Sequence, residues 1–100
     1  MRHRLARLDE LPREGGSLFE LPDGREVAVF RDGDRVRVLD AVCPHRGASL
    51  AFGEVRAGIV WCPLHAWPFR LCDGSCPEFP GVSVRTYDVS VDGGEVFLEL

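Results

Sequence analysis

The stretches CPHRGASL, residues 43–50, and CPLHAWPF, residues 62–69, are the most informative part of this 100-residue sequence. Each begins with a cysteine followed by a proline, and each has a histidine two or three positions after the cysteine: Cys43 and His45 in the first, Cys62 and His65 in the second. A thiolate and an imidazole this close together, on a turn stiffened by proline, are able to point into one cavity. The two stretches therefore predict one metal site with two cysteine and two histidine ligands.

Two kinds of metal centre take this ligand set. One is tetrahedral zinc, and the other is a [2Fe-2S] cluster in which two histidines replace two cysteines on one iron. Structural zinc sites usually pair like ligands, whereas each stretch here holds one ligand of each kind. In a two-iron cluster, each stretch can give its cysteine to one iron and its histidine to the other. The spacing favours the cluster, and a zinc-binding structural module is the alternative.

The two stretches resemble the cluster-binding loops of the Rieske [2Fe-2S] family, in particular its soluble, low-potential ferredoxins. The chain is also similar to the small subunit of assimilatory nitrite reductases. The resemblance implies one [2Fe-2S] cluster per chain, with Cys43 and Cys62 on one iron and His45 and His65 on the other. It implies an electron carrier without catalytic residues, which takes electrons from a reductase and passes them to an oxygenase or another terminal oxidoreductase. A nitrite reductase small subunit is the alternative within the family.

Two features of the loops bear on the expected properties of the cluster. The family usually has glycine directly after the second histidine, where this chain has Ala66, and alanine is strained there if the backbone needs a positive φ. High-potential members have hydroxyl side chains and a disulfide around the cluster, whereas the matching residues here are Ala48, Leu64, Trp67 and Phe69. None of these can donate an O–H hydrogen bond, so we expect a potential at the low end of the Rieske range of roughly −150 to +300 mV.

Two further cysteines, Cys72 and Cys76, flank a predicted turn at residues 73–75. The resemblance supplies four ligands from the two loops, so we interpret this pair as incidental, with a redox-active thiol pair as the alternative. The proline-containing stretch at residues 77–81 resembles the family's third loop, which shields the cluster from water.

Short β-type segments separated by turns make up most of the remaining chain. Residues 25–30 and 35–39 flank a turn and predict a hairpin, residues 17–21 precede them, and residues 82–91 and 95–100 are joined by Asp92-Gly93-Gly94. This pattern predicts an all-β, Rieske-like antiparallel sandwich or partly open barrel. We expect one domain, residues 1–100, with a loop-rich cluster-binding subdomain at about residues 43–81 inserted in the β base.

Charge and hydropathy limit the partners and the location. The formal net charge of −4 disfavours nucleic acid as a partner, because binding phosphates needs a basic surface. Residues 73–100 hold one arginine among six acidic residues, which indicates a solvated acidic surface or a face for a basic partner. No apolar run approaches the roughly 20 residues of a membrane span, and no secretory signal is evident, so we expect a cytoplasmic protein without a membrane partner.

Overall fold

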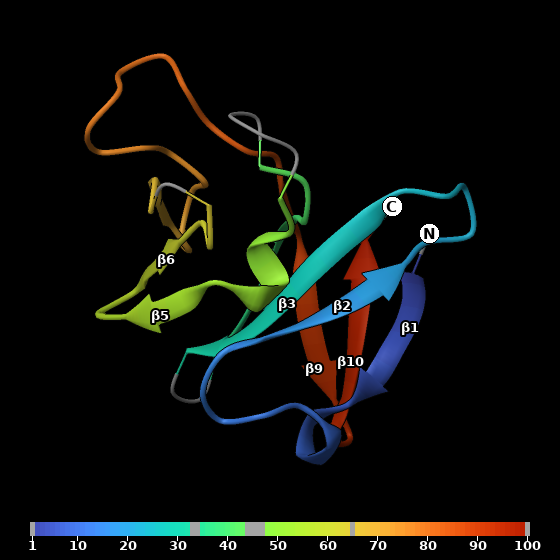
Figure 1. Ribbon diagram of the computed structural model, residues 1–100. Coiled ribbons are helices and arrows are strands. Elements are labelled where there is room, and N and C mark those ends of the chain that lie inside the picture. Colours follow the sequence, from blue (N-terminus) through green and yellow to red (C-terminus); the bar gives the residue numbers. More distant parts are fainter. Residues whose placement is uncertain (1, 33–34, 44–47, 65, 100) are drawn as a thin grey trace.

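The computed structural model describes residues 2–32, 35–43, 48–64 and 66–99. Within these ranges the chain forms short strands and two single turns of 3-10 helix, η1 and η2, which confirms the all-β prediction (Figure 1). In chain order the elements are β1 (Arg2–Arg7), η1 (Leu8–Glu10), β2 (Gly16–Glu20), β3 (Glu26–Asp32), β4 (Arg35–Asp40), η2 (Leu50–Phe52), β5 (Glu54–Arg56), β6 (Ile59–Trp61), β7 (Pro68–Arg70), β8 (Thr86–Tyr87), β9 (Val89–Asp92) and β10 (Glu95–Glu99). No helix among the described residues has the length and apolar character needed to cross a bilayer.

The strands form three antiparallel sheets, with the orders β1-β10-β9, β2-β3-β4-β8 and β5-β6-β7. The predicted hairpins appear as β3–β4 and β9–β10. The turn between β9 and β10 uses Gly93 and Gly94, both with positive φ (60° and 78°), a conformation that costs glycine little.

β3 is the central element because it is buried on both faces. Val27 and Val29 point into a core that the second sheet shares with β1 and β10. Ala28 and Phe30, on the opposite face, point into a second core that contains Cys43, Cys62 and Phe69. A strand buried on both sides is apolar at consecutive positions, which explains the unbroken run of apolar residues here. One strand thus separates the core of the β base from the core beneath the cysteines.

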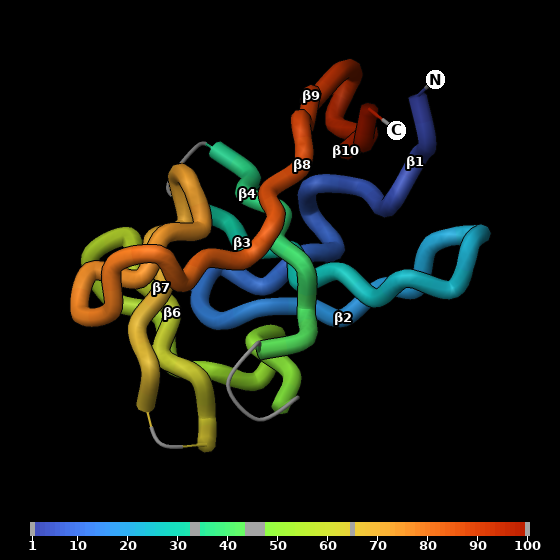
Figure 2. The backbone as a smooth tube through the Cα atoms, turned by 90° about the horizontal axis from the view of Figure 1, so that it is seen from above, coloured from blue at the N-terminus to red at the C-terminus, as the bar shows by residue number. Residues whose placement is uncertain are grey.

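The cysteine-bearing segment has its own small sheet, β5-β6-β7. Figure 2 shows β6 and β7 at one end of the molecule and β1, β9 and β10 at the other. Hydrogen bonds link this sheet to the turn that follows it, for example from the Leu71 amide to the Gly58 carbonyl (2.9 Å) and from the Arg70 amide to the Ser75 carbonyl (2.8 Å). The segment therefore has regular structure beyond the single strand expected at residues 58–61.

The prediction of one continuous strand at residues 82–91 was wrong. β8 pairs with β4, and β9 pairs with β10, so the chain changes sheets between Tyr87 and Val89. Before β8, Ser83 makes only an isolated bridge with Ser75, and Val84 is buried in the core around the cysteines. The parts of this segment therefore belong to different sheets.

β1, which pairs with β10 in antiparallel orientation, was not predicted from the sequence. Its arginines meet acids of the C-terminal hairpin: Arg4 Nε lies 2.7 Å from Glu95 Oε1, and an Arg2 nitrogen lies 3.6 Å from Asp92 Oδ2. Part of the C-terminal negative charge is thus balanced within the chain. Because these pairs are exposed, each contributes only about 0 to 1 kcal/mol.

Candidate metal centre

Two loops of matching construction carry the predicted cysteines. The Cys43 amide donates to the Ala48 carbonyl, and the Cys62 amide donates to the Trp67 carbonyl, each at 2.8 Å. In both loops the bond joins the cysteine to the residue five positions later, and a paired residue follows at once: Ser49 bridges Val42, and Pro68 begins β7. The same backbone closure therefore fixes both cysteines.

Both cysteines are almost fully buried, each with 1% of its surface exposed. They belong to one apolar core, together with Leu50 and Phe69. The predicted histidine ligands, His45 and His65, lie outside the described residues. Among the described residues, no group of three or more histidine, cysteine and acidic side chains is placed to hold a metal ion.

The two thiols are neighbours and are electrostatically suited to a positively charged centre. Burial raises the pKa of the Cys62 thiol, a hydrogen bond from the Leu64 amide opposes that rise, and the adjacent Cys43 side chain adds to it. Two thiolates side by side in an apolar core are unfavourable unless a cation compensates them. Iron ions supply that charge, so the buried pair fits an iron–sulfur cluster.

Ala66 has φ 53°, in the left-handed region that favours glycine. Its amide donates to the Cys62 carbonyl (3.1 Å), so the strained residue closes the turn that follows the cysteine. The positive φ at which alanine replaces the family's glycine is confirmed.

Aromatic residues cover the second loop. Phe69 is fully buried in the core with both cysteines. Trp67 is half-buried against the same core and stacks on Phe79, with ring centroids 4.2 Å apart and planes 20° apart. Phe79 belongs to the stretch at residues 77–81, so this stretch lies against the second loop. Phe79 was not predicted to contact the second loop, although an aromatic residue in a proline-containing loop indicates a packing contact.

The other two cysteines have different surroundings. Cys76 is 4% exposed and packs in the core with Cys43 and Cys62, whereas Cys72 is exposed on the turn before it. Both are free thiols. Cys76 therefore serves as a small apolar core residue, in line with the incidental interpretation.

Comparison with known proteins gives the same result as the two loops. The sequence matches the Rieske [2Fe-2S] domain over residues 2–88. It is 30% identical over 94 residues to the ferredoxin component of a naphthalene 1,2-dioxygenase system from Pseudomonas aeruginosa, covering 93% of this chain and 89% of that protein. It is 38% identical over 84 residues to cholesterol 7-desaturase from Bombyx mori, covering 75% of this chain but only 18% of that protein. The chain thus spans about a fifth of the length of such larger relatives.

Solved structures with the same fold include two small proteins of similar size. The ferredoxin of carbazole 1,9a-dioxygenase from Nocardioides aromaticivorans superposes with a TM-score of 0.89 at 39% identity, covering 98% of this chain and 96% of that one. A nitrite reductase small subunit from Mycobacterium tuberculosis has a TM-score of 0.89 at 32% identity, with coverage of 98% and 93%. The family match favours the two-iron centre over the zinc module. A [2Fe-2S] cluster exchanges single electrons, so a domain that holds one transfers electrons. The chain belongs to the Rieske [2Fe-2S] domain family and takes one such cluster.

Proposed function

We propose that this chain is a ferredoxin that takes one electron at a time from a reductase and delivers it to an oxygenase or a similar terminal enzyme. The observation that carries the proposal is the pair of matching loops that bring Cys43 and Cys62 into one buried core. The likeness to two dioxygenase ferredoxins over nearly the full length of each chain supports it. The cytoplasm, where thiols stay reduced, is the proposed location.

We propose Cys43, Cys62, His45 and His65 as the ligands of the cluster. When bound, the cluster accepts and releases one electron. The chain's own contribution is to bury both thiols, to hold the Cys43 and Cys62 amides in matching hydrogen bonds, and to exclude water with Phe69. Neutral imidazoles leave the oxidised centre less negative than four thiolates do, which makes it easier to reduce. Residues 43–81 are the proposed cluster-binding subdomain within a single domain of residues 1–100.

Substitution of the cysteines tests the ligand set. We expect Cys43→Ser and Cys62→Ser to lose the visible absorption of the cluster together with its iron and sulfide. The matched controls are Cys72→Ser, at an exposed thiol, and Cys76→Ser, at a buried thiol in the same core. Both controls keep the spectrum. Purified protein that is colourless and holds one zinc, or a Cys62→Ser variant with an unchanged spectrum, would overturn the assignment.

A second candidate function is the small subunit of a nitrite reductase, which the near-complete superposition on such a subunit favours. The two functions differ in whether the chain works free or permanently bound. Gel filtration of the chain co-expressed with the products of its neighbouring genes distinguishes them. A ferredoxin elutes alone, whereas a subunit elutes with its large partner.

A further inference from the structure

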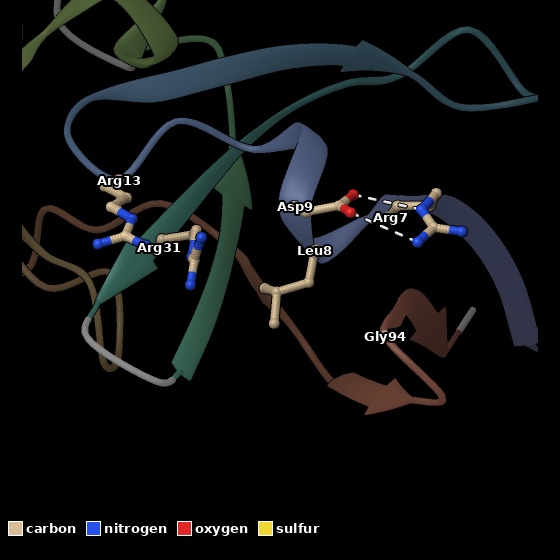
Figure 3. A pocket seen from close by; sticks show the side chains of 6 residues that line it. All are labelled: Arg7, Leu8, Asp9, Arg13, Arg31 and Gly94. Carbon is tan, nitrogen blue, oxygen red and sulfur yellow. Dashed lines mark hydrogen bonds and ion pairs between the residues drawn. The ribbon is translucent and has the colours of Figure 1, made fainter.

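A pocket of about 310 Å³ lies at the end of the β base, away from the cysteine-bearing loops. Its lining residues come from four parts of the chain: Arg7, Leu8 and Asp9 around η1, Arg13 in the loop after η1, Arg31 on β3, and Gly94 of the β9–β10 turn. Figure 3 shows the Arg13 and Arg31 side chains on one side of the pocket and the Arg7–Asp9 pair on the other, with Leu8 between them. In Figure 1, η1 lies at the bottom of the molecule, and the loop that contains residues 77–81 lies at the top.

Positive charge dominates the pocket although the protein as a whole is acidic. Of the described residues, three arginines and one aspartate line it, a local excess of two positive charges in a chain of net charge −4. The aspartate is already engaged, because Asp9 accepts bonds from Arg7 Nε (3.2 Å) and from a terminal Arg7 nitrogen (3.4 Å). The acids Glu10 and Asp32 also have partners. Glu10 accepts a hydrogen bond from the Arg7 amide, and Asp32 forms an ion pair with Arg37 Nε at 4.0 Å.

Among the residues that the structure describes, Arg13 and Arg31 are therefore left without an acidic partner. Neither side chain has an ion pair or a hydrogen bond in the part of the chain that the structure describes. Arg31 is half-buried on β3. Like charges facing one cavity repel each other, and an anion between them turns that repulsion into attraction.

Backbone hydrogen bonds hold the other wall of the pocket in place. The Leu8 amide donates to the Gly94 carbonyl (2.8 Å), which ties η1 to the β9–β10 turn. The Arg7 amide donates to Glu10 Oε1 (2.8 Å), which fixes the start of η1. A wall that is already held in place loses little conformational freedom when a ligand enters.

We propose that this pocket binds a small oxyanion, through phosphate or carboxylate groups held by Arg13 and Arg31. The planar guanidinium matches the geometry of both groups and forms two parallel hydrogen bonds with either. The pocket lies near the lower limit of ordinary small-ligand sites, which measure roughly 300–1,000 Å³, so the ligand is small. This site is independent of the cluster and of the proposed electron carrier role.

Titration of the cluster-loaded protein, followed by amide NMR shifts, tests the proposal. Inorganic phosphate and succinate are added in separate arms, with sodium chloride at matched ionic strength as the reference. We expect saturable shifts for amides around η1, Arg31 and Gly94, and the arm with the higher affinity identifies the preferred oxyanion. Loss of one charged hydrogen-bond donor, in Arg13→Gln or Arg31→Gln, weakens binding about tenfold.

Arg56→Gln is the matched control, because Arg56 lies outside the pocket and pairs with Glu54 at 3.0 Å. It leaves the affinity unchanged. The visible spectrum of the cluster shows that each variant is folded, and Arg13→Gln carries the test alone if the half-buried Arg31 proves necessary for folding. Shifts that do not saturate, shifts equal to those in chloride, or equal affinity in wild type and Arg13→Gln would overturn the proposal.

Discussion

Replacement of Ala66 by glycine is expected to stabilise the protein. Ala66 has φ 53°, and its amide closes the turn behind Cys62. A left-handed conformation costs an L-residue roughly 1–2 kcal/mol, whereas glycine adopts it without penalty. Glycine also makes the unfolded chain more flexible, which offsets about 0.4–1 kcal/mol of the gain. We therefore expect Ala66→Gly to raise the free energy of unfolding by about 0.5–1 kcal/mol.

The effect is measurable as a shift in melting temperature. In a domain of about this size, 1 kcal/mol corresponds to roughly 4–8 °C, so the expected gain is about 2–8 °C. Proteins with bound cofactors often do not unfold in two states. Wild type and variant are therefore compared at one scan rate, with cluster absorption and far-UV circular dichroism followed together. Ala66→Val, which adds a β-branched side chain to the same backbone, lowers the melting temperature.

Ala57→Gly provides a matched control, because Ala57 has φ 52° in the turn between β5 and β6. Its backbone strain is the same, but it lies outside the two cysteine-bearing loops, so the same reasoning predicts a similar gain. If Ala57→Gly stabilises the protein and Ala66→Gly does not, backbone strain at residue 66 does not limit the stability of the cluster-loaded protein, which contradicts the prediction.

Three other predictions concern the β base, the turn at residues 72–76 and the cluster. Tyr87 donates to Asp40 and accepts from Arg25, so Tyr87→Phe lowers the free energy of unfolding in urea by about 1–3 kcal/mol; an unchanged value contradicts this. Burial and the hydrogen bond to Asp40 raise the pKa of Tyr87 in the folded protein above the unfolded value near 10.0. The stabilisation that Tyr87 gives the folded protein is therefore complete below the unfolded pKa and is lost as the pH rises through the folded pKa. Tyr87→Phe does not show this loss of stability at alkaline pH. A Cβ at Gly74, where φ is 75°, would lie 2.1 Å from the Val84 carbonyl oxygen. Gly74→Ala therefore lowers the melting temperature in the same scans by about 10 °C or more. The control Gly81→Ala, at φ 90° with open space around the added Cβ, lowers the melting temperature less. Redox titration gives a midpoint below about +100 mV, because residues 48, 64, 67 and 69 have no hydroxyl; a higher value shows that other donors stabilise the reduced cluster.

Much of the fold was predictable where the signal was local. The alternation of Val36 and Val38 with arginines identified β4, and the Asp92-Gly93-Gly94 turn identified the last hairpin. β1 was missed because a strand at the edge of a small sheet depends on its partner, and that partner, β10, lies at the other end of the chain. For the same reason the break between β8 and β9 was not visible, since the sheet that each part joins is set by distant residues.

The ligand chemistry of this protein was predictable from residue types alone. The identity of Cys43, His45, Cys62 and His65, and their spacing within each loop, are local properties, and they predict the cluster provided that the fold brings the two loops together. Only the tertiary structure separated the remaining cysteines, Cys76 in the core and Cys72 at the surface. Only the tertiary structure brought Arg13 and Arg31 to one pocket. Burial and charge balance depend on contacts between segments far apart in the chain, whereas ligand chemistry depends on the residues themselves.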